Sequence, residues 1–201
     1  MIRIYLVRHS RTHGNALRRY IGVTDEPLSK EGVALLEKYH YKRGEALYVS
    51  PLSRCRQTAS LIFPNQKQVI IENLSECNFG EFENKSAKEL EGNENYQKWI
   101  DSKASMPFPK GEDLGGFQKR CIRGFYEVVE DMKASKIKSA VLVVHGGTIM
   151  ALMNHFAKPS KEFYEWWVDN GQGYEFWVDE NDASVFVDWQ PLFCNMKNQK
   201  D

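Results

Sequence analysis

Residues 6–15 read LVRHSRTHGN, and they follow an apolar run that begins at Ile2. The β-branched run predicts a buried strand, and the threonine, glycine and asparagine after it predict a loop. The sequence therefore places His9 beside Arg8 at the carboxyl end of a strand, where open α/β sheets bind ligands. An arginine fork binds two phosphoryl oxygens at once, and a histidine held there can attack phosphorus. Taken alone, the pair also fits a strand followed by two solvated charges.

Two further strand-to-helix junctions carry residues suited to an anion. Residues 46–49 predict an apolar strand that leads through Ser50 into a helix, and helix N-termini favour bound anions. We expect Arg56, about one turn into that helix, to point toward the same crevice. Residues 141–148 read VLVVHGGT, so another strand delivers His145 and two glycines into a helix. Glycine lets a backbone N–H, such as that of Gly146, approach a ligand closely.

An acidic residue follows a third strand-like run. Residues 73–83 read NLSECNFGEFE, with Glu76 among apolar and aromatic neighbours. A carboxyl group in such surroundings has a raised pKa and can serve as a general acid. The alternative is that Glu76 is one more surface acid, as we expect Glu81 and Glu83 to be.

The order of these motifs resembles that of the histidine phosphatase (phosphoglycerate-mutase-like) superfamily. The resemblance runs from about residue 2 to residue 189 and rests on strand–Arg-His, Ser-Pro-Leu-x-Arg-x-x-Gln-Thr-Ala, Glu-x-x-Phe-Gly and strand–His-Gly-Gly. Within the superfamily the chain is most similar to the α-ribazole phosphatases of cobalamin biosynthesis. That likeness rests on residues 74–83, on Asn95-Tyr96-x-x-Trp99, on Pro109-x-Gly111-Glu112 and on residues 171–173.

The resemblance implies a phosphomonoester hydrolase that acts through a phosphohistidine on His9. Glu76 would protonate the leaving alkoxide and then activate water, and His145 is the third catalytic residue implied. The implied ligands of the phosphoryl oxygens are Arg8, Asn15, Arg56, His145 and the N–H of Gly146. The implied substrate is α-ribazole 5′-phosphate or adenosylcobalamin 5′-phosphate.

Two residues depart from the family pattern. Ser10 stands where the family usually has glycine, and a serine fits only if the backbone keeps a negative φ. Arg11 stands where an acidic or amide residue is common and adds a cation near the mouth of the site. Neither is a catalytic group, so we expect both to modify specificity.

The alternation of apolar runs predicts an α/β fold of three layers, α/β/α, with a mostly parallel central sheet and a small helical cap insertion. The expected strands lie near 2–7, 45–49, 68–72, 139–144, 173–179 and 184–188, and the expected helices near 15–20, 29–41, 52–62, 115–135 and 147–157. A chain of 201 residues suits a single domain, 1–201. The resemblance implies that the cap covers the substrate with residues at about 84–113. Aromatic residues could line it: Tyr96, Trp99, Phe108, Trp166 and Trp167.

The charges indicate a small-molecule partner. Lys plus Arg and Asp plus Glu both total 27, so no basic excess argues for nucleic acid. The local cluster at Arg8, Arg11, Arg18 and Arg19 is a weaker sign of it. No apolar run approaches a membrane span, and the polar start Met1-Ile2-Arg3 is unlike a signal peptide. The sequence does not indicate an oligomeric state.

The four cysteines predict free thiols. Cys55, Cys77, Cys121 and Cys194 form no Cys-x-x-Cys pair, which argues against a zinc site and favours a reducing cytoplasm. We expect neither a metal nor a cofactor.

Three other functions remain open. A broad phosphatase for sugar phosphates or phosphoproteins would carry the same motifs. A phosphoglycerate mutase would share every catalytic residue, but such enzymes generally have a longer central insertion than 84–113. A non-catalytic module that binds a phosphorylated ligand would need the arginines but neither His9 nor Glu76.

Overall fold

A six-stranded mixed sheet forms the centre of the computed structural model, which describes residues 1–102 and 105–192. Its strand order is β3-β2-β4-β1-β5-β6. The strands are β1 (Ile2–Arg8), β2 (Ala46–Val49), β3 (Gln68–Ile70), β4 (Ser139–Val144), β5 (Gly173–Val178) and β6 (Phe186–Pro191). The first four in chain order run parallel to one another, whereas β5 is antiparallel to both its neighbours. The predicted, mostly parallel sheet is therefore confirmed.

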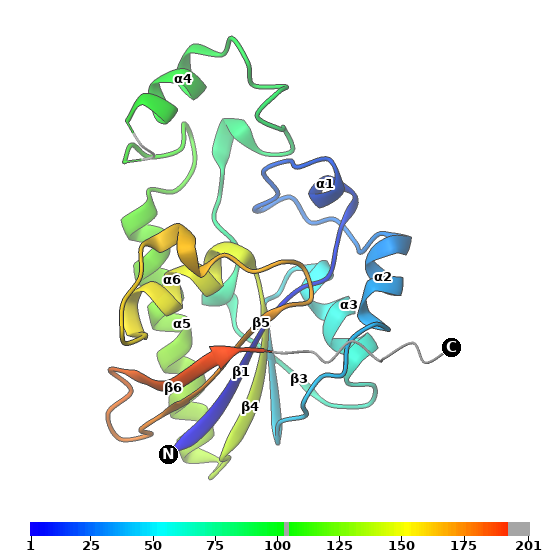
Figure 1. The fold of residues 1–201 in the computed structure, drawn as a ribbon, viewed down its shortest axis with the longest axis vertical. Coiled ribbons are helices and arrows are strands. Elements are labelled where there is room, and N and C mark those ends of the chain that lie inside the picture. Colours follow the sequence, from blue (N-terminus) through cyan, green and yellow to red (C-terminus); the bar gives the residue numbers. More distant parts are fainter. Residues whose placement is uncertain (103–104, 193–201) are drawn as a thin grey trace.

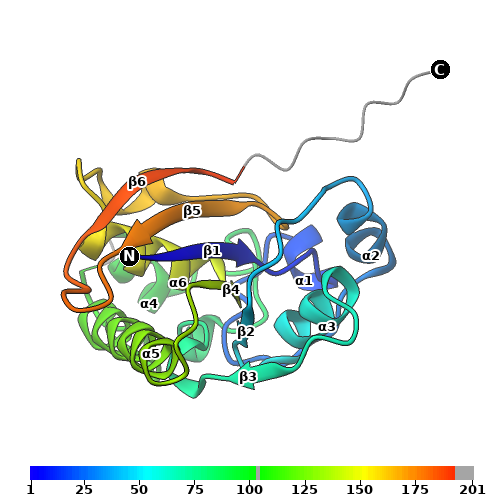
Figure 2. The same ribbon diagram turned by 90° about the horizontal axis from the view of Figure 1, so that it is seen from below.

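Helices cover both faces of this sheet (Figure 2). They are α1 (His13–Ala16), α2 (Lys30–Leu36), α3 (Ser53–Ile62), α4 (Glu94–Asp101), α5 (Leu114–Ala134) and α6 (Gly146–Phe156). Successive side chains of a strand point to opposite faces, so Ile4 and Leu6 of β1 join the core under α5 and α6, while Tyr5 and Val7 join the core under α3. The three-layer α/β/α architecture is confirmed.

The long helix α5 forms most of one layer. Asp113 caps its start, since the carboxylate accepts the N–H of Gly116 at 2.8 Å. Its apolar stripe at helical spacing is buried, as the sequence predicts: Phe117, Cys121, Phe125, Val128, Val129 and Met132. This packing holds α5 against α6 and leaves its first turns beside the carboxyl ends of the strands (Figure 1).

Two helices end earlier than the sequence predicts. The first helix begins at His13, because Thr12 and Asn15 form a capping box, and it stops at Ala16 before Arg18 adopts a φ of 55°. The second ends at Leu36, and Tyr39 and Tyr41 beyond it pack against the core under α3. Neither difference changes where the strands end.

The segment between the 3₁₀ turn η2 (Gly80–Phe82) and α5 lies beyond the carboxyl ends of the parallel strands, with α4 in it (Figure 1). An aromatic cluster joins this segment to the body of the molecule. Within the segment, the ring centroids of Trp99 and Phe108 lie 4.9 Å apart. The hydroxyl of Tyr20, which lies outside the segment, forms a hydrogen bond with the hydroxyl of Tyr96 at 3.2 Å. The segment is thus packed over the strand ends through apolar contacts.

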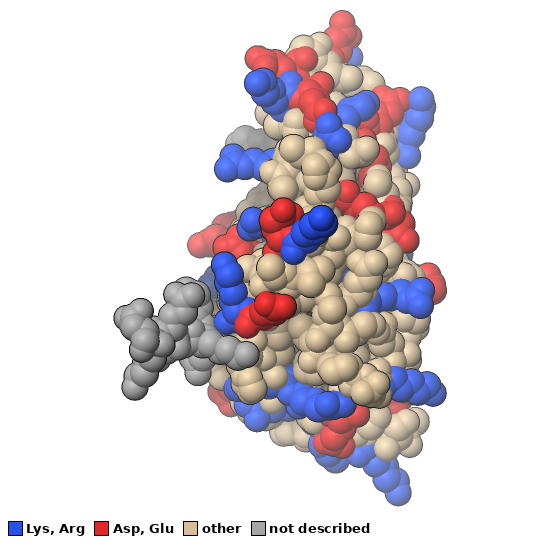
Figure 3. Space-filling view, turned by 90° about the vertical axis from the view of Figure 1, so that its right-hand side faces the viewer, with Lys and Arg blue, Asp and Glu red and all other residues tan. Residues whose placement is uncertain are grey.

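Basic and acidic side chains are interspersed on the face that carries α2 and α3 (Figure 3). This distribution matches the equal totals of positive and negative residues. Within the described residues, no helix has the length and apolar character needed to cross a membrane.

Candidate active site

A cavity of about 880 Å³ opens at the carboxyl ends of β1 and β4. Five residues that the sequence singles out line it together: Arg8, His9, Asn15, Glu76 and Gly146. They come from β1, from the loop and helix after it, from the loop after β3 and from the first turn of α6. Segments far apart in the sequence therefore meet at one edge of the sheet, as the strand-end argument predicts.

His9 is held as one tautomer. Its Nδ1 lies 2.7 Å from the carbonyl oxygen of Ser10, and because a carbonyl only accepts, Nδ1 carries the proton. The Nε2 lone pair is then free. Burial, followed by the nearby charges of Arg54 and Arg8, holds the pKa of His9 well below its ordinary value. The imidazole is therefore neutral, which a nucleophile requires.

Ser10 fits the loop without strain. The backbone φ of Ser10 is not positive, so a serine fits where the family usually has glycine. Its N–H donates to Thr58 Oγ1 at 2.9 Å and its hydroxyl donates to the Gly32 carbonyl at 2.6 Å. These bonds tie the loop after His9 to α2 and α3.

Arg8 and Asn15 present donors to the cavity. The Arg8 guanidinium stacks over Trp167, 4.2 Å from the ring centroid, and donates to the Val168 carbonyl at 2.7 Å. Its Nε is buried without a protein acceptor. The Asn15 carbonyl oxygen accepts from Asn170 Nδ2 at 3.2 Å, which leaves the Asn15 amide NH₂ available to a ligand.

Asn170 is a site residue that the sequence does not reveal. Besides Asn15, its Nδ2 donates to the carbonyl of His9 at 3.1 Å. It lies in a loop before β5 whose pattern carries no signal. Only its contacts identify it.

Arg54, and not Arg56, belongs to the site. Arg54 is fully buried, and it donates through Nε to His145 Nδ1 at 3.3 Å and through both Nη atoms to carbonyls of residues 21, 22 and 24. Arg56 is exposed and lines a different hollow between α3 and β3. The expectation for Arg56 is wrong because α3 turns that residue away from the cavity.

His145 lies beside His9, with ring centroids 5.1 Å apart. Its Nδ1 accepts from Arg54, so the proton sits on Nε2, which donates to Ser50 Oγ at 2.7 Å. Burial and then the charge of Arg54 hold its pKa well below the ordinary value. His145 is thus neutral and behind His9, and both ring nitrogens are bonded to the protein.

Glu76, from the loop after β3, lines the same cavity as His9. Burial raises its pKa, although its carboxylate accepts the N–H of Cys77 and that of Gly147, each at 3.0 Å. A side chain at Gly147 would place a Cβ 2.3 Å from Glu76 Oε1, so this approach requires glycine. A buried carboxyl with a raised pKa is suited to donate a proton.

The outer part of the cavity is aromatic with a charged rim. Trp99, Phe108 and Trp167 line it as expected, whereas Tyr96 and the fully buried Trp166 do not. Further aromatic rings join the wall: Tyr20, Phe79, Phe117, Phe163 and Tyr164. The rim carries Arg11, Arg18, Arg19 and Asp169.

Comparison with known proteins agrees with this geometry. Residues 4–189 match the model of the histidine phosphatase superfamily (branch 1). A protein of Hydrogenobacter thermophilus with the provisional name phosphoserine phosphatase 2 is 32% identical over 161 residues, which is 76% of this chain and 77% of the relative. The adenosylcobalamin/alpha-ribazole phosphatase of Salmonella typhimurium is 26% identical over 179 residues, 85% and 87% of the two chains. The alpha-ribazole phosphatase of Shigella flexneri has the same fold, with a TM-score of 0.74 at 22% identity over 92% of this chain and 94% of the other. The chain therefore belongs to the histidine phosphatase superfamily.

Proposed function

We propose that this chain hydrolyses phosphomonoesters through a phosphohistidine on His9, and that α-ribazole 5′-phosphate or adenosylcobalamin 5′-phosphate is its substrate. The observation that carries the reaction is that a nucleophile and a candidate acid line one cavity. His9 offers a free Nε2, and the buried Glu76 has a raised pKa. A binding module needs neither. We also assign the chain to the cytoplasm, since Cys55, Cys77 and Cys121 are free thiols.

In the first half-reaction His9 Nε2 attacks phosphorus while the ester P–O bond breaks. The departing alkoxide takes the proton of Glu76. Arg8, Asn15 and the N–H of Gly146, the first residue of α6, bind the equatorial oxygens. We propose that the Nε2–H of His145 joins them by exchanging Ser50 for a phosphoryl oxygen. The guanidinium groups supply the positive charge, so no metal is called for.

In the second half-reaction water replaces the histidine. The Glu76 carboxylate takes a proton from water as the water oxygen attacks phosphorus, and the P–N bond breaks. Inorganic phosphate leaves, and Glu76 is protonated again. The Nδ1–H of His9 stays on the Ser10 carbonyl, which stabilises the positive ring of the intermediate.

The leaving group is inferred from the cavity wall. Trp99, Phe108 and Tyr164 line the cavity and offer apolar surface to an aromatic base such as dimethylbenzimidazole, and the volume of about 880 Å³ suits a ligand of nucleotide size. We propose that the segment at 84–113 acts as the cap over this base. The likeness to α-ribazole phosphatases supports the same substrate class.

Phosphoserine is a second candidate, because Arg11 and Asp169 line the same cavity. A guanidinium and a carboxylate at the rim suit the carboxylate and ammonium groups of an amino acid. The similarity to a phosphoserine phosphatase supports this alternative.

The phosphohistidine is tested by replacing His9. Wild-type protein mixed with ³²P-labelled substrate and quenched under alkaline conditions should carry an acid-labile, base-stable adduct. His9→Ala should lack the adduct and turnover, whereas His13→Ala, which changes the exposed histidine at the start of α1, should keep both. An adduct on the His9→Ala protein would show that the nucleophile is another residue.

The acid is tested through the leaving group. An alkoxide needs a proton as the P–O bond breaks, whereas p-nitrophenolate does not. Because general acid catalysis contributes about 10²–10⁴-fold, Glu76→Gln should slow burst-phase phosphorylation by alkyl esters by that order, with a much smaller effect on p-nitrophenyl phosphate. Glu81→Gln is the control, since the Glu81 carboxylate lies outside the cavity and contacts Lys110 and Asn95 at the surface. Equal losses of phosphorylation rate with both esters would show that a group other than Glu76 protonates the leaving group.

A further inference from the structure

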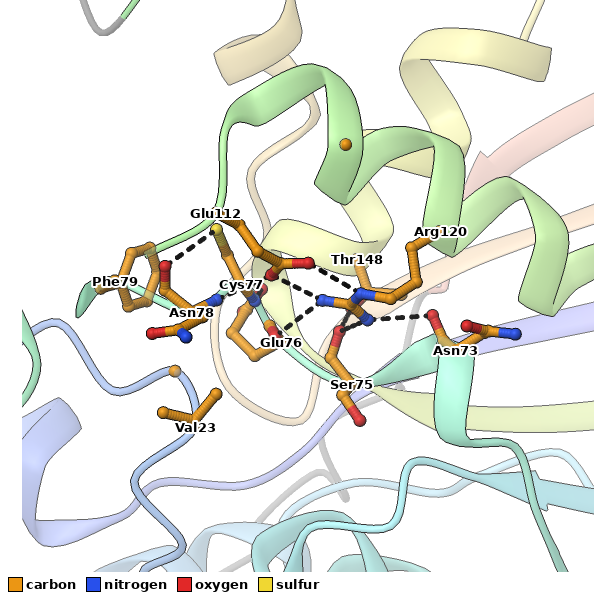
Figure 4. A network of polar contacts seen from close by, with 12 residues as sticks. Val23, Asn73, Ser75, Glu76, Cys77, Asn78, Phe79, Glu112, Arg120 and Thr148 are labelled. Carbon is orange, nitrogen blue, oxygen red and sulfur yellow. Dashed lines mark hydrogen bonds and ion pairs between the residues drawn. The ribbon is translucent and has the colours of Figure 1, made fainter. Parts of the chain in front are cut away.

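A polar network behind Glu76 connects three segments of the chain (Figure 4). Arg120, on the second turn of α5, lies at its centre. Its guanidinium donates to three backbone carbonyls of the loop that carries Glu76: those of Asn73 at 3.1 Å, Ser75 at 2.9 Å and Glu76 itself at 3.1 Å. One side chain thus fixes the path of this loop up to and including the acid.

Glu112 completes the network from the end of the segment at 84–113. Its carboxylate accepts from Arg120 Nε at 2.9 Å and Nη2 at 2.8 Å, and it also accepts the N–H of Asn78 at 2.9 Å. The Arg120–Glu112 pair is a two-pronged fork, the strongest geometry for such a contact. Glu112 therefore orients the Arg120 guanidinium and holds the far end, at Asn78, of the loop at 73–78 that carries Glu76, here called the acid loop.

The backbones on either side are in close contact. The N–H of Glu112 donates to the Asn78 carbonyl at 2.9 Å, and that of Glu81 donates to the Pro109 carbonyl at 2.8 Å. A Cβ on Gly111 would lie 2.4 Å from the Asn78 oxygen, so only glycine permits the approach. The end of the segment and the acid loop are held as one unit.

The two charges of the network persist at neutral pH. Burial alone raises the pKa of Glu112, but the hydrogen bonds from Arg120 and Asn78 outweigh it and hold that pKa below its ordinary value. Burial also opposes the charge of Arg120, and the bond to Glu112 outweighs it. The fork is an ion pair in the working enzyme.

We propose that Arg120 and Glu112 are positioning residues that hold residues 73–78 so that the Glu76 carboxyl faces the leaving group. Neither residue lines the cavity, so neither touches substrate. They act on the proton transfer and leave phosphate binding unchanged. This inference rests on the proposed role of Glu76 as acid.

The test replaces Arg120 by lysine, which keeps the charge but has only three donors on one nitrogen and cannot form the fork. Arg120→Lys should slow phosphorylation by an alkyl monoester about tenfold or more, as removal of part of a general-acid effect does. Phosphorylation by p-nitrophenyl phosphate and the KM of both esters should change by less than about twofold. Burst amplitude measures the fraction of active protein, so a loss of folded enzyme is separated from a loss of rate.

Two further variants make the result specific. Glu112→Gln keeps the shape but removes the charge, and it should give the same selective loss even if Arg120→Lys folds poorly. Arg123→Lys makes the same substitution at an exposed position of α5 and should be silent. In the Glu76→Gln background, Arg120→Lys should have no further effect on the alkyl ester, because residues that act through one group are not additive.

The outcomes separate this inference from the proposed function. A selective loss in Glu76→Gln without one in Arg120→Lys and Glu112→Gln would overturn the positioning role and leave the acid assignment intact. Equal losses on both esters, or additive losses in the Glu76→Gln background, would also overturn it. If Glu76→Gln itself shows no selective loss, the acid assignment fails and the inference fails with it.

Discussion

Arg54 and Arg56 are two positions apart on α3, and this spacing decides which of them reaches the site. An α-helix turns about 100° per residue, so the two side chains point roughly 200° apart. Arg54 shares a buried face with Cys55, Thr58 and Ala59, whereas Arg56 is exposed. The same face was visible in the sequence, because Cys55 and Ala59 are the apolar pair one turn apart. A burial argument applied to that helix would have selected Arg54.

This contrast gives a matched prediction. Arg54→Lys keeps a positive charge but cannot hold His145 and the loop carbonyls together, so phosphorylation should slow by about 10²–10³-fold, the cost of losing one preorganised donor. Arg56→Lys, the same change two residues on, should leave the rate within about twofold. Single-turnover kinetics, normalised to burst amplitude, measure both. A large loss of rate in Arg56→Lys would show that Arg56 acts in the site, as expected from the sequence.

His9 and Glu76 show how burial alone can prepare two opposite roles. Desolvation disfavours the charged form of any group, so it lowers the pKa of His9 and raises that of Glu76. The cations Arg54 and Arg8 reinforce the first shift and oppose the second. One cavity thus yields a neutral nucleophile and a carboxyl that holds its proton to higher pH than an ordinary glutamate, the pairing that acid–base catalysis uses.

At the scale of elements, strands were predictable and loops were not. All six strands lie where apolar runs predict them, within a few residues, and the ends of β1 and β4 bring Arg8, His9 and Gly146 to one cavity. The contacts that orient these residues come from outside the strands, such as that of the loop residue Asn170 with the His9 carbonyl and that of Arg120 of α5 with the Glu76 carbonyl. Their partners are backbone carbonyls, which every residue has. Sequence patterns therefore cannot indicate such pairings.

Glu83 illustrates the same limit, because the structure gives it contacts that its place in the sequence does not indicate. Its carboxylate accepts the N–H groups of Gly22, Val23, Thr24 and Phe79 and the Thr24 hydroxyl, at 2.6–3.3 Å. It joins the loop at 22–24 to η2. The carbonyls of that loop in turn hold Arg54.

A stability measurement follows from this contact. Glu83→Gln turns an NH₂ group toward backbone donors, so the free energy of unfolding should fall by about 1–3 kcal/mol, the cost of unmet buried hydrogen bonds. Glu81→Gln, which affects an exposed ion pair with Lys110, should change it by less than about 1 kcal/mol. Urea denaturation measures both variants. Equal midpoints for the two would mean that the loop bonds contribute little to folding.

At the scale of the whole molecule, the strand ends supply the phosphate end of the cavity, and several separate segments, that at 84–113 among them, supply its aromatic wall. Arg8, His9 and Gly146 sit on strand ends and a helix start, which the two packed layers fix in place. Trp99 and Phe108 belong to the segment that stands over them (Figure 1). If the proposed function holds, the reaction depends on the part that sequence predicts well, and the choice of substrate depends on the aromatic wall, which sequence predicts least.

The last prediction concerns that substrate. If the aromatic wall binds a base, α-ribazole 5′-phosphate should have a higher kcat/KM than phosphoserine or 3-phosphoglycerate. Base stacking on an aromatic ring contributes about 1–3 kcal/mol, so Tyr164→Ala at the exposed rim of the wall should lower kcat/KM for α-ribazole 5′-phosphate by about tenfold. The same variant should leave kcat/KM for phosphoserine unchanged. Tyr126→Ala, at an exposed tyrosine outside the cavity, is the control. A higher kcat/KM with phosphoserine, lowered instead by Arg11→Ala, would favour the amino-acid substrate.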